Sequence, residues 1–179
     1  MLYFTAFWRI MMEIRKATYN DIDDMMTIIK QAQSYFYNHG IDQWQDGYPN
    51  PTQLHNDITK GHSYVLCDDH IIATMYFAIE EDMNYPGIKG EWLTGLDADY
   101  GVIHRIVVDE NCKGKAYAKI LLDFAVEQCK ANNISSIRID THEDNLSMQR
   151  FLLKNNFKLC GHITLQSGAP RIALEKIID

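Results

Sequence analysis

The sequence has few of the features that mark disordered, fibrous or disulfide-stapled chains. Only 10 glycines and 4 prolines occur among 179 residues, and there is no repeat, charge run or low-complexity tract. The four cysteines lie too far apart for a CxxC motif or a metal-finger pattern. This spacing favours reduced, mostly buried thiols. A chain of this length buries enough surface to fold without such staples.

Positive charge and long apolar runs are also scarce. The net charge of −7 argues against a general nucleic-acid or anionic-membrane partner. The apolar start, residues 1–11, is shorter than the roughly 20 residues that span a bilayer, and its one basic residue, Arg9, comes too late for a signal peptide. We interpret it as an N-terminal extension, from an upstream start or as a segment that packs on the body. Residues 12–179 are then one domain of a cytoplasmic protein.

The hydrophobic periodicity predicts a mixed α/β domain with a central sheet. Alternating or continuous apolar runs predict strands at 12–17, within a hairpin at 63–79, and at 101–110, 134–142, 157–165 and 170–178. Helical spacing predicts helices after Asn20, at 51–60, at 115–133 and at 145–156, with Asn20 and Asn145 as N-caps. Two long loops, 40–53 and 80–101, contain aromatic residues and are typical of segments that cover a site.

The join between the strand 101–110 and the following helix has an unusual composition. Residues 111–122 contain three lysines and no acid, although the protein is acidic, and small residues keep the backbone accessible. A helix N-terminus offers free N–H groups and the positive end of a dipole, which suits a pyrophosphate. An exposed turn with solvated lysines is the alternative interpretation.

This join resembles motif A of the GCN5-related N-acetyltransferases, the GNAT family. The loop from Lys113 to Ala118 is similar to the family's pyrophosphate loop, and the stretch from Asn145 to Phe157 resembles motif B. The resemblance covers about 165 residues, 13–177. It implies a mixed, mostly antiparallel sheet with a splayed central strand pair, flanked by helices on both faces.

The resemblance also implies an activity. The chain would transfer an acetyl group from acetyl-CoA, its co-substrate, to a primary amine by direct transfer in a ternary complex, without a metal. The acceptor would be a small-molecule or protein amine, and a homodimer is expected. The implied cofactor-binding residues are Ile106, Val107, Val108, Lys113, Gly114, Lys115, Ala116, Tyr117, Ala118 and Asn145.

Four residues depart from the family pattern. Lys113 replaces Arg or Gln, which keeps the charge but loses the bidentate fork. Ala116 replaces glycine near the start of the helix; alanine is acceptable in a helical conformation, which we expect there, but its methyl slightly crowds a phosphate pressed on the backbone. Asn156 replaces glycine before Phe157 and tolerates a left-handed helix end. Phe151 replaces the tyrosine thought to protonate the departing thiolate, which leaves a catalytically weak acyl-CoA-binding sensor or interaction module as the alternative function.

Two histidines are candidate catalytic bases for the amine proton. His104 lies on the strand before the loop, and His142 lies at the end of the next strand, beside Asp140. A base with a pKa near 7 suits this step. The alternatives are structural, with His104 a satisfied buried side chain and His142 an exposed strand-end residue. Arg105 lies in an apolar strand and needs an anion or solvent, and Asp140 is a candidate structural partner across the two strands.

The loops supply the candidate substrate contacts. Aromatic residues in and beside them either line a pocket for a cationic amine or anchor the loops to the core; they are Tyr35, Tyr37, Trp44, Tyr48, Trp92 and Tyr100. Acidic residues in the same loops would suit a cationic acceptor, or are simply solvated; they are Asp42, Asp46, Asp97 and Asp99.

Overall fold

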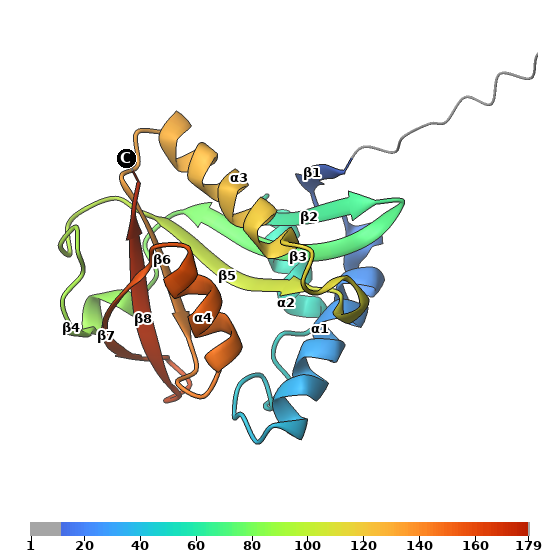
Figure 1. Ribbon diagram of the computed structural model, residues 1–179, viewed down its shortest axis with the longest axis horizontal. Helices are drawn as coiled ribbons and strands as arrows, with labels where there is room; N and C mark the ends of the chain where they lie inside the picture. Colours follow the sequence, from blue (N-terminus) through green and yellow to red (C-terminus); the bar gives the residue numbers. More distant parts are fainter. Residues whose placement is uncertain (1–11, 179) are drawn as a thin grey trace, which may run out of the picture.

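The computed structural model describes residues 12–178, so the proposed extension at 1–11 lies outside the described residues. Its core is an eight-stranded sheet (Figure 1). The strands follow the order β1 (Glu13–Lys16), β2 (Ser63–Asp68), β3 (His70–Ile79), β5 (Gly101–Val108), β6 (Ser136–Thr141), β8 (Pro170–Ile177), β7 (Lys158–Thr164) and β4 (Lys89–Gly90). β5 and β6 run parallel, and the other neighbouring pairs are antiparallel. The predicted fold class is confirmed.

Helices cover both faces of the sheet. α3 (Tyr117–Ala131) and α4 (Leu146–Lys154) bury Leu121, Leu122 and Leu152 against one face. α1 (Ile22–Asn38) and α2 (Pro51–Thr59) cover the opposite face of the N-terminal strands. In Figure 1, α3 crosses β3 and β5, while α4 lies beside β6.

The local predictions differ from the structure mainly at element ends. Asn20 is not the cap of the first helix, because Thr18 and Asp21 form a capping box around the short 3-10 helix Tyr19–Asp21 that precedes α1. Asn145 does cap α4, since its side chain accepts a hydrogen bond from the Met148 N–H at 3.1 Å. The loop at 80–101 contains a 3-10 helix, Tyr85–Gly87, and the short strand β4, which the sequence did not reveal.

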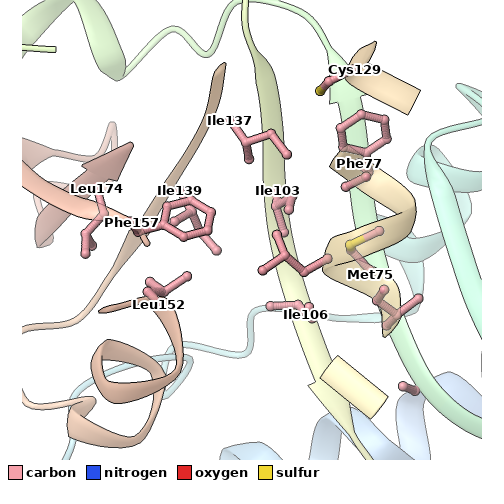
Figure 2. Close-up of a cluster of buried hydrophobic side chains, with 14 of the residues drawn as sticks. Met75, Phe77, Ile103, Ile106, Cys129, Ile137, Ile139, Leu152, Phe157 and Leu174 are labelled. Carbon is pink, nitrogen blue, oxygen red and sulfur yellow. The ribbon is translucent and has the colours of Figure 1, made fainter. Parts of the chain in front are cut away.

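The central parallel pair separates soon after it begins. β5 and β6 are in register only at Gly101 with Ile137 and at Val102 with Arg138. Beyond these positions the two strands diverge, and their buried isoleucines pack in one core cluster (Figure 2). The edge of β5 toward β6 is therefore free of strand partners from Ile103 onward. A free edge of this kind can bind an extended amide-bearing molecule.

A bulge changes which way the side chains of β5 point. The β3–β5 register shifts by one residue between Thr74 and Tyr76, and Arg105 on β5 has a φ of 51°. The extra residue turns His104 and Arg105 toward the same face, because a bulge interrupts the alternation of side chains. Ile103 and Ile106 both pack in the core on the other face.

Candidate active site

The β5–α3 loop, residues 109–116, leaves the end of β5 and leads into α3. It contains the 3-10 turn Glu110–Cys112, followed by Gly114 and Ala116, whose φ values are +80° and 62°. Ala116 is the N-cap of α3 and no side chain caps this helix, so its first N–H groups stay open to a ligand. We expected a helical conformation for Ala116; this was wrong, because the chain must turn through the left-handed region before α3 begins.

α1 holds this loop in place from the other side. The Gln31 side chain donates to the Asp109 carboxylate at 3.1 Å and accepts from the Glu110 N–H at 2.9 Å. The Lys113 ammonium lies 5.0 Å from the centre of the Tyr35 ring. Three contacts from α1 thus hold the loop, which favours a preformed anion site.

A cleft of about 1280 Å³ runs from the loop, along the free edge of β5, to the β7–β8 turn. Ten of the twelve predicted site residues line it, and Lys115 and His142 do not. The ten are His104, Ile106, Val107, Val108, Lys113, Gly114, Ala116, Tyr117, Ala118 and Asn145.

One buried hydroxyl in the cleft has no partner. Thr141 at the end of β6 is 1% exposed, and its Oγ1 makes no hydrogen bond with the described residues. Thr141 shares with Ile137 and Ile139 the face of the sheet that α3 and α4 cover, and it also lines the cleft. A buried hydroxyl normally has a hydrogen-bond partner. Together with the free edge of β5 and the uncapped start of α3, it fits a long ligand that carries amides and phosphates.

The predicted contact Asn145 is already engaged by the protein. Its side chain caps α4 and also donates to the Gln43 Oε1 at 3.0 Å. Both side chains are buried. This bond ties the loop between α1 and α2 to the start of α4, across the mouth of the cleft.

The His104 cluster consists of His104, Asp82, Asp140 and Tyr85. The Nε2 atom of His104 lies 3.0 Å from Asp82, and Nδ1 lies 3.7 Å from Asp140. Tyr85 donates to Asp140 at 3.0 Å. Two carboxylates thus face the two ring nitrogens of one half-buried imidazole.

The two carboxyls of the cluster have opposite pKa shifts. Burial raises the pKa of Asp140 above its usual value, against the opposing effects of His104 and Tyr85. Burial also acts on Asp82, but its hydrogen bonds with His104 and Asn84 outweigh it and hold the pKa of Asp82 below its usual value. Asp82 is therefore the firmly ionised partner of His104.

Arg105 binds a different carboxylate from the one we expected. Its Nη2 lies 2.7 Å from Asp57 on α2, and its Nη1 donates to the Tyr48 hydroxyl. The predicted pairing with Asp140 is wrong, because the bulge directs Arg105 toward α2, while Asp140 faces His104. The guanidinium also lies 4.7 Å from the centre of the Tyr76 ring. Arg105 thus fastens α2 and the loop before it to β5.

His142 has a local structural contact. It is 8% exposed, and its Nδ1 accepts a hydrogen bond from the Asp144 N–H at 3.1 Å, within the turn between β6 and α4. It is therefore buried, not the exposed strand-end residue of the alternative interpretation. Of the two histidines, only His104 is brought into the cleft.

The loop aromatics divide into two groups, apart from Tyr37, which is exposed and does not line the cleft. Tyr35, Trp44 and Tyr48 line the cleft. Trp92 and Tyr100 are core residues, and the Arg138 guanidinium lies 4.4 and 4.0 Å from their ring centres. Among the acidic loop residues, Asp42 and Asp46 line the cleft, whereas Asp97 and Asp99 do not.

The comparisons with known proteins agree with this geometry. Residues 17–157 match the Acetyltransferase (GNAT) family. The chain belongs to this family. It is 31% identical to a GNAT-family acetyltransferase from Streptococcus agalactiae, with a TM-score of 0.83 and 99% of each chain covered. No curated protein matches the sequence.

More distant structures share the fold of this GNAT chain. The PaiA N-acetyltransferase from Thermoplasma acidophilum, solved in complex with coenzyme A, is 18% identical with a TM-score of 0.70, covering 93% of this chain and 99% of the other. A ribosomal-protein-alanine N-acetyltransferase from Brucella melitensis is 13% identical with a TM-score of 0.65, covering 92% and 99%.

Two kinds of feature are absent from the described residues, 12–178. No helix there combines the length and apolar character that a membrane crossing requires. No three His, Cys, Asp or Glu side chains in that range are placed to share a metal ion. All four cysteines are free.

Proposed function

We propose that the chain is an N-acetyltransferase that moves an acetyl group from acetyl-CoA to a primary amine by direct transfer. The observation that carries this proposal is the continuity of the cleft. One cavity joins the anion-ready β5–α3 loop, the free edge of β5 and the His104 cluster. The preferred acyl group, the cytoplasmic location and a homodimer stay predictions from the sequence.

The binding residues act through backbone groups and charge. The N–H groups at the start of α3 and the ammonium of Lys113 hold the pyrophosphate, because a helix N-terminus and a nearby cation both favour an anion. The free edge of β5 at Ile106–Val108 bonds the pantetheine amides, and Thr141 offers a hydroxyl to the same arm. Acetyl-CoA supplies the acetyl group as a thioester, which an amine attacks readily.

His104 is the base for the amine proton. A protonated amine is not a nucleophile, so the proton must leave before attack, and an imidazole suits this transfer near neutral pH. Asp82 stabilises the imidazolium that forms, because its carboxylate lies 3.0 Å from Nε2. The acidic residues Asp42 and Asp46 at the cleft attract a cationic acceptor.

Phe151 favours a second candidate function. It lines the cleft at the position where the family pattern has tyrosine, and a phenyl ring cannot protonate a thiolate. A free thiol has a pKa near 8.5, so the thiolate is a tolerable leaving group without help. A catalytically weak acyl-CoA sensor is the alternative, and it differs by binding acetyl-CoA without transferring acetyl to any amine.

The test combines binding with turnover. Calorimetric titration with acetyl-CoA, CoA and NADPH measures affinity, and thiol release in the presence of an amine panel measures transfer. We expect acetyl-CoA and CoA to bind and NADPH not to, and an amine to accelerate thiol release. Binding without amine-dependent release would favour the sensor, and no binding of either CoA form would overturn both functions.

A further inference from the structure

Three arginines project from one face of the sheet, and two of them have a buried carboxylate partner. Arg138 on β6 is 1% exposed and lies 3.1 Å from Glu175. Arg105 on β5 lies 2.7 Å from Asp57. A buried guanidinium needs such a partner, because removing it from water costs several kcal/mol.

Arg171 on β8 is the third arginine, and it lacks a carboxylate partner. It is only 8% exposed, yet no carboxylate of the described residues lies within 4.0 Å. Its one hydrogen bond runs from Nη1 to the adjacent Pro170 carbonyl at 2.7 Å. A guanidinium has five N–H donors, so most of its bonding capacity is unused. Arg171 lines the cleft, where a ligand can reach it.

The neighbouring carboxyl, Asp140, forms no ion pair with Arg171 within 4.0 Å, although the charge of Arg171 acts to lower the pKa of Asp140 against the effect of burial. In the β6–β8 register Asp140 faces Ala173, which places Arg171 at the diagonal position, about 7–8 Å away between Cα atoms. Asp140 already accepts a hydrogen bond from Tyr85 and faces His104. Burial also raises the pKa of Asp140, which weakens its capacity to act as a counter-ion.

Arg171 shares the cleft with the site of amine activation. The strands that carry His104, Asp140 and Arg171 are consecutive in the sheet, β5, β6 and β8, although β5 has diverged from β6 before it reaches His104. The cleft therefore presents a base with two acidic groups at one point and, at another, an arginine that has no ion-pair partner within 4.0 Å among the described residues.

We propose that Arg171 binds a carboxylate of the acceptor, so that the acceptor is an amino acid or a similar molecule that carries both an amine and a carboxylate. The planar guanidinium fork matches a carboxylate with two parallel hydrogen bonds. The amine of the same molecule faces His104 and Asp82. This inference rests on the proposed acetyltransferase function and adds the substrate class.

The test compares acceptors that differ only in the carboxylate. Thiol release from acetyl-CoA is measured with L-lysine and cadaverine, L-tyrosine and tyramine, and L-histidine and histamine. We expect the amino acid of at least one pair to exceed its decarboxylated partner at least tenfold in kcat/KM. Arg171→Gln should reduce that ratio to below about twofold by raising KM for the amino acid alone, and Arg171→Lys should retain part of it.

The controls separate binding from folding. Lys176→Gln removes one positive charge from the same strand outside the cleft, and it should leave the ratio unchanged. Calorimetry of the amino acid with CoA-saturated protein gives a readout that does not depend on turnover. Arg171→Gln should abolish that heat and keep the affinity for CoA.

Three outcomes would overturn the proposal in distinguishable ways. If every pair favours the decarboxylated amine, transfer is real and the carboxylate site is wrong. If Arg171→Gln lowers both members of each pair equally, Arg171 has only a structural role. If no amine accelerates thiol release although acetyl-CoA binds, the proposed transferase function fails and this inference fails with it.

Discussion

The β5–α3 loop and the His104 cluster face the same cleft but are assembled in different ways. The loop is contiguous, residues 109–116, and its binding groups are backbone N–H groups with one nearby lysine. The cluster joins Asp82, Tyr85, His104 and Asp140, which come from a long loop and two strands. Changes in the cluster should therefore affect the chemical step and stability strongly, whereas changes in the loop should affect affinity modestly.

The largest effect is expected at His104. His104→Gln should lower kcat by about 10²–10⁴-fold, because a positioned base contributes about that much. His142→Gln is the matched control, since His142 lies outside the cleft, and it should change kcat less than threefold. Steady-state kinetics with acetyl-CoA and an accepted amine measure both. The reverse ranking would reassign the base to His142.

Arg105 tests how far the stability of the protein depends on contacts between β5 and segments distant in the sequence. Arg105→Ala leaves Asp57 buried without its partner, and the two residues are 48 positions apart in the sequence. The free energy of unfolding should fall by about 3–5 kcal/mol, as for other broken buried pairs. Lys119→Ala, which breaks the exposed pair with Asp123, should cost less than about 1 kcal/mol in the same urea titration. Equal losses would contradict the buried-pair assignment.

Lys113 tests whether the β5–α3 loop binds acetyl-CoA. Lys113→Glu should weaken acetyl-CoA binding by about 10–100-fold, because a charge-assisted hydrogen bond contributes about 1.5–3 kcal/mol. Lys113 is exposed and its one described contact is with the Tyr35 ring, so the melting temperature should change little. Lys115→Glu makes the same charge change two residues away, outside the cleft lining, and calorimetry should show a smaller loss. Equal losses would mean that long-range charge, and not the position of Lys113, attracts the ligand.

The contrast also explains what could be predicted from the sequence. The loop, the capping by Asn145 and the left-handed Asn156, whose φ is 65°, depend on a few adjacent residues, so local patterns indicated them. Asp82 and Asp57 were missed because their contacts with β5 join segments far apart in the chain. An acidic residue in a long loop carries no signal of which strand it will face.

Besides the conformation of Ala116, two predictions failed because they depend on how separate segments pack. Thr18 and not Asn20 provides the cap before α1, because both residues have suitable side chains and only the preceding β1 decides where the turn begins. The pairing of Arg105 with Asp140 was wrong because the bulge in β5 is invisible in a run of apolar and β-branched residues. In both cases the outcome depends on how β1 and β5 are placed in the folded protein, which the local sequence does not show.

The two carboxyls that flank His104 should contribute to the pH dependence of the free energy of unfolding with opposite signs. The lowered pKa of Asp82 contributes stability above the usual pKa of 3.8, and this is lost as pH falls through the lowered value. The raised pKa of Asp140 makes its ionisation unfavourable, so stability falls as pH rises from 3.8 through the raised value. Asp82→Asn should reduce the loss of stability as pH falls. Asp140→Asn should reduce the loss of stability as pH rises toward neutrality. Urea titrations from pH 3 to 7 measure both, and slopes of the same sign would contradict the assignment.

The smallest effect is expected at Ala116. Its left-handed conformation costs about 1–2 kcal/mol for a residue with a Cβ, and glycine removes that cost while adding about 0.5–1 kcal/mol of chain entropy. Ala116→Gly should therefore be at least as stable as the parent and bind acetyl-CoA as well or better. Ala118→Gly, inside the first turn of α3, should instead lose up to about 1 kcal/mol. Calorimetry and thermal melts compare the two, and equal losses would show that the turn at Ala116 is not strained. An unchanged or higher affinity of Ala116→Gly for acetyl-CoA would support binding through the backbone of the loop, because this variant has no side chain at that position.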